Sequence, residues 1–570
     1  VWTGPDVDTY GTPSPDGRYL SYTDWETGDL AIRELATGKT RRLTKTGTQK
    51  QPAVFALNSV ISPDNKLVAY SWTNEYSTYD LCLIGIDGSG NRILYNSKDK
   101  DEVYPESWSS DGKQIAARRY GEKAEIISIA VADGSIQVLK TFEKLFWPRF
   151  CYSPDDRFIA YDFPVEENSG NHDISLISTD GSGEISLIEH PANDRLLGWT
   201  PGRKEILFLS DRLGTWDAWI IQVDNGKPLG APKRIKPDLG KVSPMAFTQN
   251  GSFYFSIYTR RFTTQIAPVD LKTGKVREQL SKPLLGSNYS AKWSPDGEYL
   301  AYVNEQTGAK GPGFYHRPLH IRHLKTGKER ELASEIEARA PRWSPDGSSI
   351  LIKGYDNNKS NQKDYNGGVY EIDVQTGHVT ELVRFPPVQE PFHINFLRDA
   401  WKTSIADWSH DRKDVFYVNR GRIFMRELES GREKQLYQDD NLRRLLDLSP
   451  DGKRLVFGTE NSDDGTWSIL IMPVSGGEPR ELCKFHKSEE SIEIRLITWT
   501  PDGKYLLFTE NFKKGSALWQ ISPEGGEPQK LWQSDKRYSG LSIHPDGQQI
   551  AFSTYEQEEE VWVMENFLPE

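Results

Sequence analysis

Three long polar segments hold the residues best suited to ligand binding or chemistry. They span 306 to 317, 355 to 368 and 385 to 403, and each mixes aromatic and cationic side chains. Guanidinium groups bind anionic groups through paired hydrogen bonds, and aromatic side chains line most ligand pockets, so these segments suit sugars or anions. The candidate ligand-binding residues are Tyr315, His316, Arg317, Lys363, Tyr365, His393, Arg398 and Trp401.

The same segments also permit one catalytic interpretation. Tyr315, Tyr365 or His393 can act as a proton-abstracting base. Arg317 or Arg398 can neutralise a uronate carboxylate, which would make the protein a polysaccharide lyase acting on acidic glycans. No G-x-S-x-G pentapeptide marks a serine nucleophile. We therefore favour a non-enzymatic protein without catalytic residues and keep the lyase as the alternative.

The sequence predicts neither a metal site nor a cofactor. His316, His320 and His323 form the one histidine cluster, but "LHIRHL" has the pattern of a strand, in which residues three apart point to opposite faces. The three cysteines lack C-x-x-C spacing, and neither a D-x-D-x-D-G calcium loop nor a G-x-x-x-x-G-K phosphate loop occurs.

Composition limits the range of partners. The chain has 570 residues, of which 36% are hydrophobic, enough for more than one packed domain. Its formal net charge of −12 opposes binding to nucleic acids and to anionic membrane surfaces. No apolar run is long enough to span a membrane, and no export signal is visible after Val1. We expect no nucleic-acid partner and no direct membrane insertion, and the oligomeric state is left open.

One hairpin pattern recurs twelve times along the chain. In "KWSPDGEYLAYV", residues 292 to 303, a strand is followed by a tight Ser-Pro-Asp-Gly turn and a second strand. Most copies lie 40 to 51 residues apart, with one spacing of 65 between Ser344 and Ser409. Each copy continues with an apolar strand, a glycine turn and a fourth strand, as in "DLAIREL", "ATGK" and "TRRLT". Such a period is typical of propeller blades.

We therefore predict an all-β chain of tandem β-propellers with about twelve four-stranded blades. Single propellers hold about four to eight blades, so the twelve divide into two rings, six plus six, with seven plus five as the alternative. The first division gives domains at 1 to 283 and 284 to 570, joined near 281 to 287. The last repeat lacks a fourth strand, and "VWTG" is an unpaired strand at the N-terminus. This strand can close the last blade and make the rings discontinuous in sequence.

Propeller connectivity places the three long segments on one face. The turns between strands one and two lie at one end of each blade, whereas the loops between strands two and three and the links between blades lie at the other. The Pro-Asp turns thus share one face, and the insertions collect on the opposite loop face of the second propeller. Long loops in compact proteins are often functional.

The repeat of Ser-Pro-Asp-Gly, a basic residue, apolar residues and Tyr or Phe resembles the TolB-like, WD40-like β-propeller repeat. The segment "LSDRLGTWDAWIIQVDNGK", residues 209 to 227, is particularly close, and the resemblance covers about Tyr10 to Phe552. It implies a periplasmic or extracytoplasmic protein of the bacterial envelope. Related repeats serve as binding, sensor or substrate-gating domains and in some lyases, so the fold alone does not select a function. We expect a non-enzymatic binding, sensor or scaffold propeller that recognises a protein, peptide or glycan through the loop face of the second propeller.

Overall fold

The prediction of an all-β chain is confirmed by the computed structural model, in which every regular element of the described residues is a strand. No helix in this part of the chain is long and apolar enough to cross a membrane. The described residues are 1–3, 7–47, 54–73, 78–97, 101–121, 123–142, 148–165, 171–202, 204–270, 275–277, 282–283, 288–304, 317–356, 367–385, 406–461, 465–486 and 491–568.

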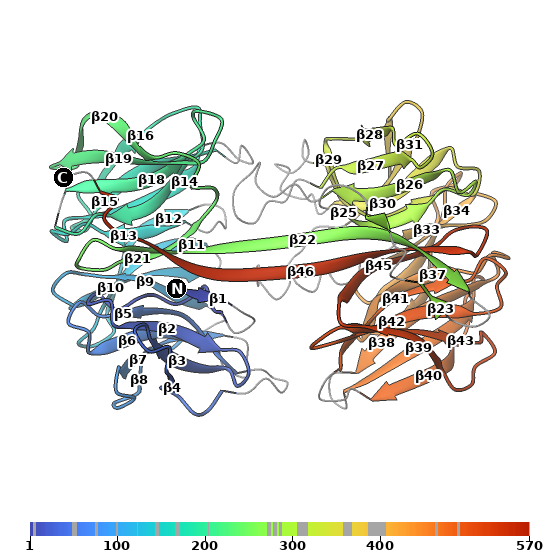
Figure 1. Ribbon diagram of the computed structural model, residues 1–570, viewed down its shortest axis with the longest axis horizontal. Helices are drawn as coiled ribbons and strands as arrows, with labels where there is room; N and C mark the ends of the chain where they lie inside the picture. The colour runs from blue at the N-terminus through green and yellow to red at the C-terminus, as the bar shows by residue number, and fades with distance from the viewer. Residues whose placement is uncertain are drawn as a thin grey trace. The chain divides into compact units, whose positions relative to one another are not determined.

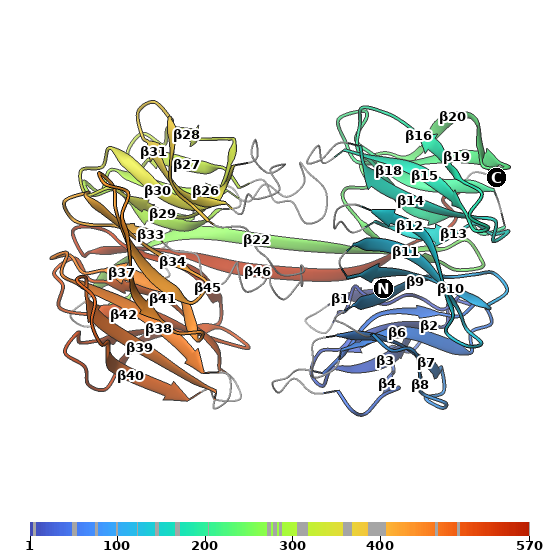
Figure 2. The ribbon, with the colours of Figure 1, turned by 180° about the vertical axis from the view of Figure 1, so that it is seen from behind.

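The chain forms two compact units, and Figures 1 and 2 show the strands of each from two sides. Unit 1 comprises Val1–Thr259 and Gln557–Glu570. Its sheets follow one another along the chain, and β5 to β12 form one eight-stranded sheet because β7 also pairs with β9. The strands are β2 (Tyr19–Asp24), β3 (Asp29–Glu34), β4 (Thr40–Arg42), β5 (Ala56–Ile61), β6 (Leu67–Thr73), β7 (Tyr79–Gly85), β8 (Arg92–Tyr95), β9 (Glu102–Trp108), β10 (Gln114–Tyr120), β11 (Ala124–Ala130), β12 (Ile136–Phe142), β13 (Phe150–Tyr152), β14 (Phe158–Pro164), β15 (His172–Ser178), β16 (Glu184–Ile188), β17 (Asp194–Trp199), β18 (Glu205–Ser210), β19 (Asp217–Asp224) and β20 (Lys227–Lys236).

Unit 2, Arg260–Glu556, contains five four-stranded antiparallel sheets in chain order. Their strands are β25 (Asn288–Trp293), β26 (Tyr299–Asn304), β27 (Leu319–His323), β28 (Glu329–Leu332), β29 (Ile336–Trp343), β30 (Ser349–Asp356), β31 (Gly368–Asp373), β32 (Val379–Arg384), β33 (Ala406–Trp408), β34 (Asp414–Asn419), β35 (Arg422–Glu427), β36 (Glu433–Gln438), β37 (Leu442–Leu448), β38 (Arg454–Asn461), β39 (Thr466–Pro473), β40 (Arg480–His486), β41 (Ser491–Trp499), β42 (Leu506–Phe512), β43 (Ser516–Ile521) and β44 (Gln529–Ser534).

A further sheet contains two long strands that belong to both units. The chain leaves unit 1 within β22 and returns within β46, and these strands are neighbours in the order β1-β46-β22-β21. β1 pairs with β46 through Trp2 and Val561, so the two ends of the chain share a sheet. The repeat count placed the join near 281 to 287, whereas the chain crosses between the units at Thr259/Arg260 and Glu556/Gln557. The strands of this sheet are β1 (Trp2–Thr3), β21 (Ser243–Phe247), β22 (Phe253–Asp270), β23 (Lys275–Val276), β24 (Lys282–Pro283), β45 (Arg537–Ile543) and β46 (Gln549–Met564).

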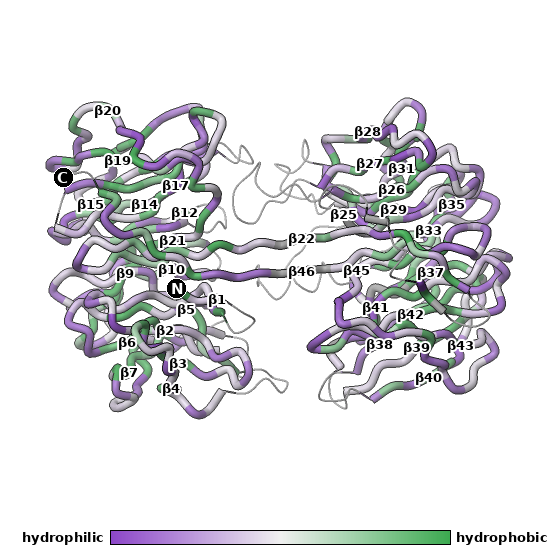
Figure 3. The backbone as a smooth tube through the Cα atoms, in the orientation of Figure 1, coloured by the Kyte–Doolittle hydropathy of each residue, from purple (hydrophilic) through white to green (hydrophobic). Residues whose placement is uncertain are grey.

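The apolar core lies between the faces of consecutive sheets. Val456, Ile469 and Leu482 of the β37–β40 sheet pack against Trp499 and Phe508 of the β41–β44 sheet, and all five are buried. Figure 3 shows hydrophobic residues along the strands and hydrophilic residues at many of the turns. Both faces of such a sheet are apolar, which matches the near-continuous hydrophobic runs of the repeat.

The first strands of the unit 2 sheets contact one another in a closed series, from β25 through β29, β33, β37 and β41 to β45 and back to β25. One hydrogen bond at the closing step joins β25 to β45, since the Trp293 N–H donates to Ser542 Oγ at 3.4 Å. We call the edge formed by the first strand of each sheet its inner edge. The inner edge of every unit 2 sheet therefore faces the inner edges of the others. Side chains of the first strands are accordingly the ones brought together from different sheets.

The repeated turns are stabilised by their own side chains. In one copy Ser344 Oγ donates to Asp346 Oδ1 at 2.7 Å, and the Ser349 N–H donates back to Ser344 Oγ at 2.9 Å. Gly347 occupies the left-handed region with φ of 73°, which explains the glycine of the motif. The same hydroxyl-to-carboxylate bond joins Ser62 and Asp64, Ser109 and Asp111, Ser153 and Asp155, Ser294 and Asp296, Ser409 and Asp411, Ser449 and Asp451, and Thr500 and Asp502.

Three turns replace the glycine with a residue that binds the preceding turn. Asn65, Asp156 and Arg412 all adopt positive φ, between 57° and 59°. Arg412 Nη1 donates to Asp346 Oδ2 at 2.6 Å, and Asp156 accepts the N–H of Ser110 at 2.7 Å. These side chains therefore link neighbouring sheets at the end where the turns lie.

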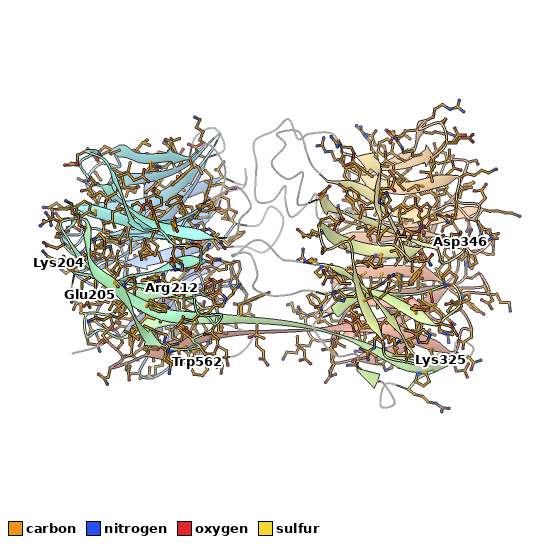
Figure 4. The ribbon with its side chains drawn as sticks, turned by 90° about the horizontal axis from the view of Figure 1, so that it is seen from above. Lys204, Glu205, Arg212, Lys325, Asp346 and Trp562 are labelled. Atoms are coloured by element: carbon orange, nitrogen blue, oxygen red, sulfur yellow. The ribbon has the colours of Figure 1, made fainter. Side chains whose placement is uncertain are left out.

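We expect Asp296→Ala to lower the free energy of unfolding by about 0.5 to 2 kcal/mol, because Asp296 accepts hydrogen bonds from Ser294 and from the Glu298 N–H. Asp346→Ala should cost up to about 1 kcal/mol more, since it also removes the ion pair with Arg412. Ligand binding should be unchanged in both variants. Urea denaturation measures the stabilities, and Lys325→Ala, at an exposed ion pair, is the control (Figure 4).

The difference between Asp346→Ala and the parent should shrink in acid. Partial burial raises the pKa of Asp346, but the hydrogen bonds from Ser344, Ser348 and Arg412 outweigh it and lower the pKa below 3.8. A carboxylate with a lowered pKa in the folded state stabilises above its unfolded pKa and loses this contribution as the pH falls. A pH-independent difference between the two proteins would contradict this assignment.

Candidate functional site

Arg317 is the candidate ligand-binding residue that lies within the described part of the chain. Its side chain is largely buried just before β27, and Nη1 donates to Glu337 Oε1 at 3.0 Å. Arg339 Nη2 donates to the same oxygen at 3.1 Å, so two guanidinium groups meet one carboxylate oxygen. The other candidates lie outside the described residues: Tyr315, His316, Lys363, Tyr365, His393, Arg398 and Trp401.

Strand pairing shows which end of unit 2 these groups occupy. Ile336 at the start of β29 pairs with Asp356 at the end of β30, and Gly368 at the start of β31 pairs with Arg384 at the end of β32. The long segments after β30 and β32 thus leave from the end where β29 begins. We call this end of the unit 2 sheets the loop end, and the end with the Ser-Pro-Asp-Gly turns the turn end.

Further charged pairs occupy the loop end on other first strands. Arg443 Nε of β37 donates to Glu460 Oε2 of β38 at 2.9 Å, and Arg495 Nε lies 2.8 Å from Glu493 Oε1 on β41. The Arg443 side chain is 20% exposed and that of Arg495 is 35% exposed. Sequence reasoning missed these groups and Glu337 with Arg339, because they lie in strands rather than in the long segments. Their signal is the presence of charged residues among apolar ones in the first strands.

A second charged group, the turn-end cluster, comes from four consecutive first strands: Lys292, Arg342, Asp407 and Asp447. Arg342 Nε lies 3.7 Å from Asp407 Oδ2, and its Nη2 lies 3.4 Å from Asp447 Oδ1. Lys292 Nζ donates to the carbonyl of Leu541 at 3.1 Å. All four residues stand two positions before the Ser of their turn, and this shared position could have revealed the cluster from the sequence.

The corresponding position of unit 1 carries no charge. The residues there are Thr12, Val60, Ser107, Cys151, Gly198 and Ala246. One structural role of the position is visible in both units, because Asp447 Oδ2 accepts the Trp499 N–H at 3.0 Å and Ser107 Oγ accepts the Tyr152 N–H at 3.2 Å. Lys292 and Arg342 cannot accept such a bond, so their charges serve something other than this link.

Burial shapes the electrostatics of the turn-end cluster. Burial lowers the pKa of Lys292 to about 7, with a contribution from the charge of Arg342. Burial likewise raises the pKa of Asp407 to about 6, against the effect of Arg342 and together with that of Asp447. Burial therefore brings the pKa values of both Lys292 and Asp407 closer to neutral pH. Among the described residues no group of three or more metal-ligating side chains occurs, and His320 stacks on Tyr302.

Antiparallel sheets packed face to face, with first strands in a closed series, define a β-propeller protein. The family model of the TolB beta propeller domain matches residues 65–309, which supports the TolB-like class over the matched segment.

The chain is also similar to named proteins over parts of its length. Dipeptidyl-peptidase 5 of Porphyromonas gingivalis is 22% identical over 401 residues, 66% of this chain and 47% of that protein. The chain thus spans about half the length of that relative. Protein TolB homolog of Chlorobium chlorochromatii is 60% identical over 42 residues, 7% of this chain and 10% of that protein. The structure of putative TolB from Agrobacterium tumefaciens has a TM-score of 0.38 at 18% identity, covering 52% of this chain and 99% of that one.

The stability of the protein should depend on pH through Lys292. Its folded pKa lies below the unfolded value, so the unfolded state binds more protons between about pH 7 and 10.5, and the free energy of unfolding should rise with pH there. The rise is limited to about 1.4 kcal/mol per pH unit. Lys292→Met should remove it, as measured by urea denaturation from pH 6 to 9.

Lys325→Met is the matched control, because the Lys325 side chain is 77% exposed in the same unit. It should reproduce the pH dependence of the parent. If Lys292→Met also does so, Lys292 is protonated in the folded state throughout this range and the assignment is wrong.

Proposed function

We propose that the two units are six-bladed propellers and that unit 1 is discontinuous in sequence. In unit 2 the five four-stranded sheets and the pair β45–β46 together supply six first strands and six second strands. In unit 1, five groups of strands begin at β2, β5, β9, β13 and β17. The sixth group consists of β21, β22, β46 and β1. This division supports the expected six plus six blades, with the N-terminal strand as part of the last group of unit 1.

We further propose that the protein is a non-enzymatic binding, sensor or scaffold propeller whose ligand docks at the loop end of unit 2. The observation that carries this proposal is the set of charged first-strand residues at the end from which the long segments leave. Glu337, Arg339 and Arg443 lie on first strands that also carry buried apolar residues, among them Ile336, Ala338 and Leu446. Charged side chains on inner strands cost desolvation and add little to packing, which favours a role in recognition.

Among protein, peptide and glycan ligands, we favour a peptide with acidic groups. The relative from Porphyromonas gingivalis is named a dipeptidyl-peptidase, and its alignment covers 66% of this chain. Arg317, Arg339 and Arg443 offer planar donors that suit carboxylates. The TolB-like resemblance also supports an extracytoplasmic location in the bacterial envelope, which we include in the proposal.

Arg339→Ala should weaken peptide binding at least about tenfold, because central arginines often dominate recognition interfaces. The ligand is first identified on peptide and glycan arrays, and its Kd is then measured by fluorescence anisotropy. Arg317→Ala, Arg398→Ala and Trp401→Ala should act in the same direction. Circular dichroism of each variant checks that it is folded.

Arg426→Ala is the control, since Arg426 is paired with Glu433 at 2.9 Å on the third strand of its sheet rather than the first. It should bind like the parent. Parent-like affinity in all four site variants would show that the ligand binds elsewhere. Formation of unsaturated products from acidic polysaccharides, seen by ultraviolet absorbance, would instead favour the lyase alternative.

A further inference from the structure

Five charged side chains from three consecutive groups of unit 1 strands form one cluster. Arg118 of β10 pairs with Glu106 of β9, and Arg195 Nε of β17 lies 3.4 Å from Asp162 Oδ2 of β14. Arg149, directly before β13, interacts electrostatically with all four of these residues. We call these five residues the unit 1 arginine cluster.

The carboxylates of the cluster are already engaged. Asp162 is fully buried, and its oxygens accept the backbone N–H groups of Arg149 at 3.1 Å and Leu196 at 3.0 Å. Glu106 accepts from Arg118 and, at 3.5 Å, from Asn58 Nδ2. Both carboxylates therefore already accept hydrogen bonds from groups other than the Arg149 side chain.

Two arginines keep donors available for a further acceptor. The Arg149 guanidinium has one polar contact among the described residues, from Nη1 to the Pro244 carbonyl at 3.4 Å. Arg195 Nη1 is buried and has no hydrogen-bond partner among the described residues, and the Arg195 side chain is only 9% exposed. Burial lowers the pKa of Arg149 to about 10, with further lowering from Arg195 and Arg118, which shows how crowded the positive charges are.

We propose that the unit 1 arginine cluster binds one carboxylate group of a ligand, held by Arg149 and by Nη1 of Arg195. Three guanidinium groups face two carboxylates, which leaves one unit of positive formal charge in a largely buried region. An uncompensated buried charge is unfavourable, and a single bound anion would neutralise it.

The charge balance selects the class of anion. A monoanionic carboxylate compensates the surplus, whereas a dianionic phosphate would leave a net negative charge in the same place. Lys241 interacts electrostatically with Arg195 and with Asp211, and since Lys241 and Asp211 carry opposite formal charges they do not alter the balance. Arg149 is partly exposed, so a small carboxylate can reach the cluster from solvent. This site lies in unit 1 and does not rest on the function proposed for unit 2.

The test uses trifluoroacetate as a carboxylate probe with the full chain, in chloride buffer of constant ionic strength. The parent protein should broaden the ¹⁹F resonance, and added acetate should reverse the broadening. Arg149→Gln should weaken the apparent affinity at least about tenfold, since it removes a charge-assisted hydrogen-bond donor. Arg119→Gln is the control, because Arg119 lies on β10 next to Arg118 of the cluster, but its Nε donates to Glu125 Oε2 at 2.7 Å.

Stability gives a second readout that separates binding from a structural role. In acetate-free chloride buffer Arg149→Gln should be at least as stable as the parent, because it removes the surplus positive charge of the cluster. Acetate should raise the unfolding midpoint of the parent but not that of the variant. A purely structural arginine would give a less stable variant and unchanged ¹⁹F broadening, which would overturn the proposal.

Two further outcomes test the location and the chemistry of the site. The Arg339→Ala variant, at the loop end of unit 2, should still broaden the ¹⁹F resonance. If Arg339→Ala loses the broadening while Arg149→Gln retains it, the proposal is overturned. Phosphate displacing trifluoroacetate at lower concentration than acetate would also overturn it, because the site would then prefer a dianion.

Discussion

Burial of apolar side chains between the faces of consecutive sheets is the interaction on which the other features of this protein depend. Each sheet has two apolar faces, so it is stable only with a neighbour on both sides. In unit 2 this requirement is met by a series that returns from β45 to β25. Because the chain leaves unit 1 in β22 and returns in β46, it must carry two strands from one unit to the other.

Closure of the series brings the first strands together and determines where charges can lie. Their side chains meet those of other sheets along the inner edges. Unit 2 uses this region for Lys292, Arg342, Asp407 and Asp447, each from a different sheet. Unit 1 has uncharged residues at the same repeat position and gathers its arginines elsewhere, around Arg149. The same framework therefore carries two different arrangements of charge.

Much of the fold could be predicted from local patterns, but little of the candidate site could. The segment "DLAIREL" contains β3 and "LHIRHL" contains β27, because alternation and turn residues act within a few positions. The long segments were recognisable by length and composition, yet the partner of Arg317 was not. Glu337 binds Arg317 from the next sheet, on a strand that also carries Arg339 and whose register shifts between Arg339 and Arg342. Such an irregularity depends on packing and has no local sequence signal.

The repeat, the strands and the turns are encoded locally in the amino-acid sequence, since these follow from backbone preferences and side-chain alternation within each copy. Folding of the whole chain is needed to pair Trp2 with Val561 and to bring Lys292 near Arg342, Asp407 and Asp447. These contacts join residues from different repeats. They form only when every sheet face is covered and the series closes, and that is a property of the whole chain rather than of any segment.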